Sequence, residues 1–461
     1  MNTRKWFIFV FVDVLLFSLL APIYAFPLGS NGWYLDSPLQ TNNSDLVCKI
    51  KVISISRGEP VSNSQLFMSG LKAYRMKATA KVLSVIKGKC PESIEIEFEY
   101  PIGNNIDTGI PISNLITGLS EKEICIVFLQ KQKDQYKLNS IKSKLRVVPE
   151  VLKHNFGDEP NMRLVDEFLA GCESDDEFIK LQAAEELGFQ SEEIIKNFRT
   201  SLSNTELFDK NALMLGKIQK ELIRSCKSKD FVIRNISYIS CFQADVSPGI
   251  EGPLQLLRTN PSVFDKNDSM KKYEIQNFSV SDLQVRLLET MDSATRRTVY
   301  DMNNRTIIRR EDGIHEIYRG LREFDYAEFF NQALDCNSVK NSEQMRKAIA
   351  NILWIRFERK SVPVIVRLLD DRDVYVRQTA VSALRKCING DYSNSWEPDD
   401  FYRSFKGNEY YFSANQKTEE SLEERQKDYQ EHEQEYIKYW KDWWQNKKKD
   451  FSEQLIEGGT K

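Results

Sequence analysis

Residues 361–390 read SVPVIVRLLDDRDVYVRQTAVSALRKCING, and this stretch decides how most of the chain folds. Apolar residues recur at helical spacing from Val362 to Leu369, a polar turn follows at 370–373, and a second apolar face begins at Val376. Small Ala380 and Ala383 on that second face let a neighbouring helix approach closely. The stretch therefore predicts two helices joined by a short turn.

A short phrase within this stretch returns five times along the C-terminal two-thirds of the chain. It consists of a cap, two spacers, an aliphatic residue and a basic residue. The copies are Asp176…Ile179-Lys180, Asp230…Ile233-Arg234, Asp282…Val285-Arg286, Ser342…Met345-Arg346 and Asp373…Val376-Arg377. Asp and Ser are good helix N-caps, because their side-chain oxygens accept the free N–H groups of the first turn. Each copy therefore predicts the start of a helix, and the set predicts an array of repeats with loops inserted at irregular intervals.

The stretch 361–390 closely resembles a HEAT repeat, the two-helix unit of α-solenoids. The matching residues are Pro363, Leu368, Leu369, Asp373, Val376, Arg377, Ala380, Ala383 and Leu384. The resemblance implies a HEAT-like α-solenoid over 155–390, in which the acidic and basic residues form a ladder along the stack. That ladder would comprise Asp176, Lys180, Asp230, Arg234, Asp282, Arg286, Asp373 and Arg377. We interpret these residues as structural, and we expect Arg377 to bond with Asp373 or with a neighbouring repeat.

Residues 45–150 follow a two-residue period instead. Apolar and polar side chains alternate near 48–53, 74–80 and 94–100, and two further strands are predicted at 123–129 and 135–139. Five strands in about 100 residues predict a small β-barrel or sandwich.

The order of these strands resembles the OB-fold barrels of netrin-like domains and tissue inhibitors of metalloproteinases. In those inhibitors the free amine and carbonyl of an N-terminal cysteine chelate the zinc of the protease. The first cysteine here is Cys48, far from the predicted start of the mature chain, so this inhibitory wedge is not carried over. OB barrels also bind single strands and sugars. Glu95, Glu97 and Glu99 on the exposed face argue against nucleic acid.

The first 25 residues have the pattern of a secretory signal peptide. Arg4 and Lys5 precede the apolar run 6–20, and Ala25 is a suitable cleavage residue. We therefore expect a secreted or periplasmic protein with no membrane association after cleavage, and an uncleaved anchor is the alternative. Residues 26–44 are predicted to be a linker.

Composition and motifs give no sign of catalysis. The net charge is −3, so no basic excess attracts nucleic acid. His154, His315 and His432 are isolated, and no HExxH, CxxC, GxSxG or phosphate-binding loop is present. A nucleophilic pair of Cys336 with His315 has no motif in support. We predict no catalytic residue, no cofactor and no metal, although one disulfide bridge among the N-terminal cysteines is allowed in an oxidising compartment.

Residues 417–451 are highly charged and lack Gly and Pro, which predicts one long helix. Its narrow aromatic stripe includes Trp440, Trp443 and Trp444 at positions i, i+3 and i+4. We interpret the helix as a cap on the last repeat, and the three tryptophans are candidate partner-binding residues. The preceding segment 391–416 is an aromatic-rich loop.

The sequence thus predicts a multidomain α+β protein, with an OB-like barrel followed by a HEAT-like α-solenoid and a long C-terminal helix. We expect an exported, non-enzymatic scaffold that binds a protein partner of unknown identity; the oligomeric state stays open. One alternative is a secreted protease inhibitor or enzyme regulator that acts through the barrel. A second is a hydrolase with an unrecognised site.

Overall fold

A computed structural model of the chain places most of the segment between Asp36 and Gly458. The predicted signal peptide, the loop 391–416, His154 and His315 lie outside the residues that it describes. The described residues are 36–61, 73–101, 118–133, 135–138, 144–153, 155–198, 205–261, 279–303, 309–310, 313–314, 321, 324–389 and 422–458.

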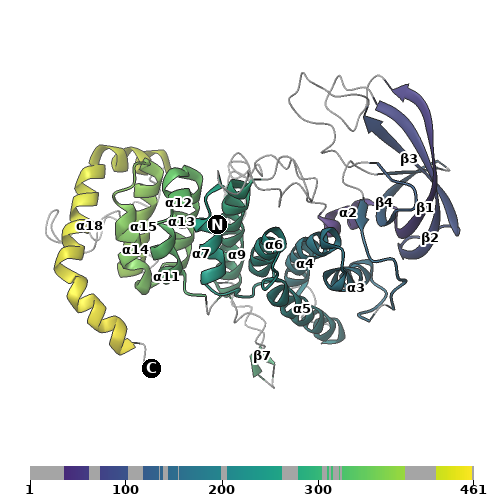
Figure 1. The fold of residues 1–461 in the computed structure, drawn as a ribbon. Helices are drawn as coiled ribbons and strands as arrows, with labels where there is room; N and C mark the ends of the chain where they lie inside the picture. The colour runs from purple at the N-terminus through teal and green to yellow at the C-terminus, as the bar shows by residue number, and fades with distance from the viewer. Residues whose placement is uncertain are drawn as a thin grey trace, which may run out of the picture.

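The N-terminal region is a closed five-stranded barrel (Figure 1). Its strands follow the order β1-β2-β3-β5-β4, and pairing of β1 with β4 closes the ring. The pairing of β3 with β5 is parallel, the other pairings are antiparallel, and a short sixth strand pairs with β4. The strands are β1 (Leu46–Val61), β2 (Ala73–Lys87), β3 (Ser93–Pro101), β4 (Ile124–Gln132), β5 (Gln135–Leu138) and β6 (Lys144–Arg146). The predicted barrel is therefore present.

Residues 46–50 of β1 and 125–129 of β4 are buried on both faces, and apart from Lys49 these residues are apolar. Cys48 and Ile50 of β1 point into the barrel core together with Val127 of β4. The intervening residues Val47 and Phe128 belong instead to the core of the helical region. One wall of the barrel is thus also the first layer of the helical core.

A buried ion pair connects that wall to the helices. Lys49 of β1 and Glu167 of α3 (Pro160–Glu173) are both fully buried, and the Nζ–Oε2 distance is 2.8 Å. Lys49 Nζ also donates to the carbonyl oxygen of Glu150 at 2.5 Å. Burial raises the pKa of Glu167, and Lys49 opposes that shift. Arg163, also on α3, donates to the carbonyl of Val85 in β2 at 2.6 Å.

Part of the segment that we predicted to be a linker, 26–44, is instead a docked helix, α2 (Ser37–Asn43). Asp36 caps it and Pro38 lies in its first turn, where a missing N–H costs nothing. The backbone N–H of Ser37 donates to Glu186 of α4 at 3.0 Å, and Lys87 of β2 donates to the carbonyl of Thr41 at 2.7 Å. Helix α2 is therefore fixed between the barrel and the helical region.

The C-terminal region is helical, as predicted, and its helices stand side by side in a row that leads away from the barrel (Figure 1). A short hairpin of β7 (Arg309–Arg310) and β8 (Gly313–Ile314) lies within the region. Beyond α2 and α3 the described helices are α4 (Glu177–Phe198), α5 (Thr205–Ser225), α6 (Phe231–Gln243), α7 (Glu251–Arg258), α9 (Val280–Asn303), α11 (Tyr326–Ala333), α12 (Asn337–Asn341), α13 (Glu343–Arg356), α14 (Val362–Leu368), α15 (Val374–Asn389) and α18 (Leu422–Gly458).

The caps of the repeated phrase begin helices at four of its five copies. For example, Asp176 Oδ1 accepts the N–H of Phe178 at 2.8 Å, and Asp230 Oδ1 accepts that of Val232 at 2.9 Å. Asp282 differs, because its helix already begins at Val280. Ser279 caps this helix, because its hydroxyl oxygen accepts the N–H of Asp282. The Asp282 carboxylate in turn accepts the N–H of Ser279 at 2.9 Å, and the two bonds form a capping box.

The basic residue of the phrase has a shared local role. Arg234, Arg346 and Arg377 each donate to a carbonyl six residues earlier in the chain. The acceptors are Ser228 at 2.9 Å, Lys340 at 2.9 Å and Asp371 at 2.7 Å. Each guanidinium therefore ties the first turn of its helix to the preceding turn.

The contacts between helices differ from the ladder that we expected. Arg377 does not bond with the Asp373 side chain, which accepts the N–H of Val376 at 3.1 Å. Its guanidinium instead reaches Glu433 of α18 at 2.8 Å. Arg346 of α13 forms an ion pair with Asp371, in the turn before α15, at 2.7 Å, and both side chains are buried. Both of these arginine cross-links use acidic residues outside the predicted set, whereas the cap carboxylate of Asp373 pairs across to Lys347 of α13 at 3.4 Å.

Helix α18 packs along the last helix pair, at the end of the row farthest from the barrel (Figure 1). It extends past the predicted end at 451 to Gly458, the first glycine after its start. Tyr429 and Trp440 are fully buried, whereas Trp443 and Trp444 are partly buried against the same core. Lys441 pairs with Asp370 at this contact. The candidate partner-binding residue Trp440 is therefore a core residue.

Replacing Lys49 by Met should lower the free energy of unfolding by about 3–5 kcal/mol, because the Glu167 carboxylate would stay buried without its cation. The double replacement Lys49→Met with Glu167→Met should recover much of that loss. Urea denaturation followed by circular dichroism measures both. A double variant as unstable as the single one would contradict this account of the junction.

Replacing Trp440 by Ala should cost about 3–5 kcal/mol, because a large, fully buried ring is removed. Trp444→Ala is the matched control on the same helix and should cost clearly less, since Trp444 is only partly buried. Thermal unfolding of the two variants tests the docking of α18, and equal losses would refute it.

Candidate functional site

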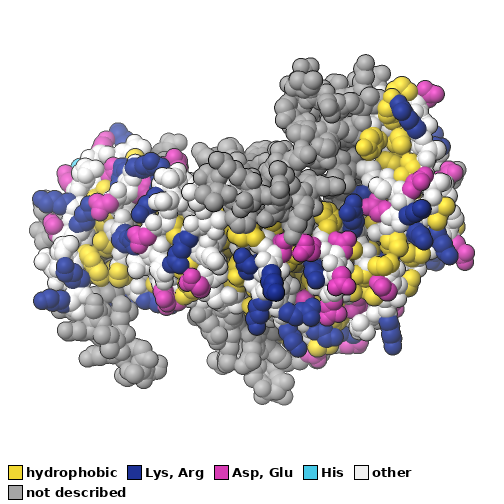
Figure 2. Space-filling view, viewed as in Figure 1, with side chains coloured by type: hydrophobic (Ala, Val, Ile, Leu, Met, Phe, Trp, Pro, Cys, Tyr) yellow, Lys and Arg dark blue, Asp and Glu magenta, His cyan; other side chains and the backbone are white. Residues whose placement is uncertain are grey.

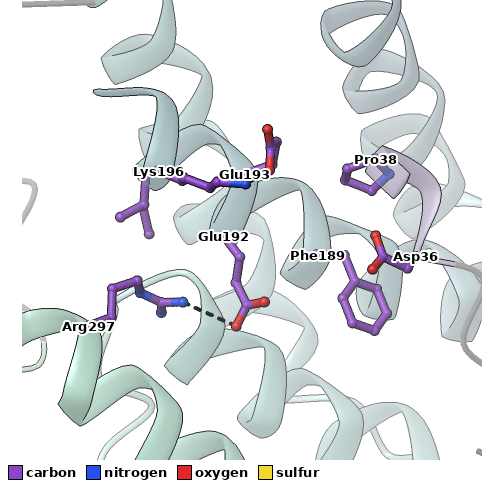
Figure 3. Close-up of a pocket in the computed structure, with 8 residues that line it drawn as sticks. Asp36, Pro38, Phe189, Glu192, Glu193, Lys196 and Arg297 are labelled. Carbon is purple, nitrogen blue, oxygen red and sulfur yellow. Dashed lines mark hydrogen bonds and ion pairs between the residues drawn. The ribbon is translucent and has the colours of Figure 1, made fainter. Parts of the chain in front are cut away.

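The site of greatest chemical interest is a cavity of about 320 Å³ between α2, α4 and α9 (Figure 3). Pockets of this size are within the range that holds small ligands or single side chains. Its lining contains both charged side chains and apolar side chains. The lining residues are Asp36, Pro38, Phe189, Glu192, Glu193, Ile195, Lys196 and Arg297.

One wall of the pocket is a buried charge cluster around Arg297 of α9. The guanidinium donates to Glu192 and to Asp245, each at 3.1 Å, and to the carbonyl of Gln243 at 3.0 Å. Burial raises the pKa values of Glu192 and Asp245, while Arg297 opposes both shifts. Arg297 is thus held in place by several acceptors and cannot swing freely into the pocket.

The opposite wall is formed by Asp36 and by the last turns of α4 (Figure 3). Asp36 adopts a left-handed backbone conformation, with φ 50°, and its Oδ1 accepts the N–H of Leu39 at 3.1 Å. Burial raises the pKa of Asp36, and nearby Glu193 raises it further, while Lys196 lowers it. Glu193 and Lys196 are 3.5 Å apart at their charged ends.

The charges of the pocket do not cancel. In the lining, Asp36, Glu192 and Glu193 are three carboxylates, whereas Lys196 and Arg297 are two cations. The excess of acidic groups can attract a cation, and partial burial strengthens that attraction relative to open water. Among the residues that the structure describes, no group of three His, Cys, Asp or Glu side chains could hold a metal ion. The acidic groups beside Phe189 and Ile195 suit a cation that also has an apolar part.

Helix α2 is positioned for the pocket by a carboxyl group beneath it. Glu186 of α4 is buried, and it accepts the N–H of Ser37 at 3.0 Å. Burial raises its pKa to about 8, and the bonds with Ser37 oppose the shift. Gln190, one turn later on α4, donates to the Ser37 hydroxyl at 2.9 Å.

Sequence reasoning missed this pocket. The run EELGFQSEE at 185–193 is rich in acidic residues, as on a solvated helix face, and its burial depends on several other elements, including α2 and α6. A signal was nonetheless present, because Asp36-Ser37-Pro38 is a helix-start pattern.

None of the predicted site residues lines the pocket. Arg286 pairs at 2.8 Å with Glu185, the neighbour of Glu186. Lys180 is partly buried near the start of α4. The predicted ladder residues and the tryptophans of α18 therefore belong to the framework around the helices and lie outside the site.

None of the cysteines lines the pocket, and neither does His432. Cys48 lies inside β1, fully buried and paired with neighbours on both sides, so it offers no free amine for an inhibitory wedge. All eight cysteines are free thiols in this structure. Cys48 and Cys90 share a side-chain hydrogen bond, which raises the pKa of Cys48 and lowers that of Cys90 to about 7. His432 on α18 lies 3.6 Å from Glu435 at the surface.

Comparisons with known proteins give no family for the chain. No protein-family model matches it, and no curated protein matches it either. Within the described residues, no helix is both long and apolar enough to cross a membrane.

Replacing Glu186 by Gln should flatten the dependence of stability on pH. The folded-state pKa of Glu186 is about 8, above the ordinary value of 4.5, so the folded protein holds a proton that the unfolded chain releases. This group therefore favours folding at low pH, and its contribution is lost as pH rises from 4.5 to about 8. Urea denaturation at pH 5 and pH 8 measures the change.

The matched control is Glu177→Gln on the exposed first turn of the same helix. That variant should keep the pH dependence of the natural protein. If Glu186→Gln kept the natural pH dependence as well, the raised pKa of Glu186 would be contradicted.

Proposed function

We propose that this protein is a non-enzymatic binding scaffold, and that the pocket beside Asp36 captures a basic side chain of a protein partner. The observation that carries the proposal is the excess of carboxylates over cations in a cavity whose walls are held by buried contacts. An arginine or lysine side chain combines an apolar stem with a charged end. Phe189 and Ile195 suit the stem, and Asp36 and Glu193 suit the charge.

Several features support a partner of protein size. The helices lie in a row, and we propose that they form a HEAT-like α-solenoid with an OB-like barrel at one end. Such stacks offer long surfaces for binding. Lys, Arg, Asp and Glu side chains are interspersed across the face shown in Figure 2, which gives no broad basic surface of the kind that attracts nucleic acid. We further propose that the protein is exported, on the pattern of residues 1–25.

The experiment is a titration of the full chain with Nα-acetyl-arginine-N-methylamide, followed by NMR or calorimetry. The uncharged isostere Nα-acetyl-citrulline-N-methylamide is the matched probe. We expect the arginine compound to bind more tightly by at least about tenfold, because only the cation complements the carboxylates. Equal binding of the two compounds would refute capture of a cation.

Variants locate the binding. Asp36→Asn keeps a cap residue on α2, and Glu193→Gln keeps the side-chain shape, so both remove charge with little change in packing. Each should weaken binding of the arginine probe severalfold. Glu177→Gln removes a charge elsewhere on α4 and should leave binding unchanged. If all three variants lost affinity equally, the arginine probe would be attracted by the overall negative charge of this region and not by the pocket.

A further inference from the structure

A second, larger cavity of about 650 Å³ lies between α7, α9 and α12. Its lining is dominated by uncharged polar side chains, including Asn260, Asn337, Asn341 and Gln284. No aromatic side chain is part of the lining. We refer to it as the amide groove.

Gln284 is the decisive residue of the amide groove. Its side chain is only 1% exposed, and its Nε2 donates to the carbonyls of Leu256 and Thr259, each at 2.8 Å. These bonds fix the amide against the end of α7. The other atom of the amide, Oε1, has no hydrogen-bond partner among the described residues. A buried acceptor left unpaired is unfavourable, so the groove contains an acceptor that a ligand donor would satisfy.

The rim supplies further amides on a rigid support. Asn337 and Asn341 are exposed and stand one helical turn apart on α12. Ser338 between them donates to the carbonyl of Leu257 at 2.6 Å, which ties α12 to α7. Each asparagine amide carries a donor and an acceptor, and this matches the pair offered by a peptide unit.

The charged residues at the rim are already engaged. Arg258 bonds with Glu251 at 3.1 Å and with Gln332 at 2.8 Å, and Asp335 pairs with Arg367 at 2.6 Å. The ligand of the groove therefore has to be neutral, with alternating donors and acceptors. A sugar would meet these needs in part, but the lining offers no ring on which to stack it.

From this arrangement we infer that the amide groove binds an extended polypeptide segment through its backbone. A ligand peptide N–H donates to Gln284 Oε1, and the amides of Asn337 and Asn341 pair with neighbouring peptide groups. Recognition of this kind depends weakly on side-chain identity and requires no positive charge. The inference is independent of the pocket beside Asp36, which selects a cation.

The test is selection of unstructured twelve-residue peptides from a phage-displayed library on the immobilised full chain, with affinities of the enriched peptides then measured in solution. Asn337→Ala with Asn341→Ala should weaken binding by roughly tenfold or more, because two pairs of backbone bonds are lost. Gln255→Ala is the matched control, since it removes an exposed amide from α7 outside the groove. That control should bind as the natural protein does.

Backbone chemistry gives a second measurement. Analogues of the best peptide with single N-methylated amides should include at least one that loses about tenfold or more in affinity, because methylation removes the donor to Gln284. The inference is overturned if no peptide is enriched, if the double variant binds equally, or if every methylated analogue retains its affinity. Glu193→Gln should leave peptide binding intact, so failure of the cation pocket and failure of the groove are distinguishable.

Discussion

The buried contact between Lys49 and Glu167 is the interaction on which the architecture depends. A charge removed from water is tolerated only when a partner and further hydrogen bonds compensate it. Lys49 finds both in Glu167 and in the carbonyl of Glu150. The pair therefore tolerates little displacement, and it holds one wall of the barrel against α3. Every later helix is stacked outward from that junction.

At this junction, the barrel wall and the helices share one hydrophobic core. Because residues 46–50 of β1 and 125–129 of β4 are buried on both faces, the apolar core continues from Val47 and Phe128 through the helices to Trp440 of α18. A helix pair in such a row cannot bury its apolar face alone, so each layer stabilises the next. The arginines of the repeated phrase support this locally, since each one joins the first turn of a helix to the preceding turn.

Both candidate binding regions lie where helices distant in sequence meet. The pocket beside Asp36 needs α2 from the N-terminal segment, α4, and Arg297 of α9. The amide groove needs the end of α7, Gln284 of α9 and the rim of α12. They complement each other chemically, because one is acidic and the other neutral and rich in amides.

The sequence by itself determined the element types. The two-residue period between 45 and 139 predicted the barrel strands, and caps such as Asp176, Asp230 and Asp373 predicted helix starts, because these are local backbone preferences. The tertiary structure decided which charged side chains form ion pairs and which side chains are buried. Glu186 and Arg297 have the sequence context of surface residues, and for Trp440 the sequence left docking of the helix and partner binding both open. All three are sheltered by segments far away in the chain, since burial depends on packing between elements and not on local pattern.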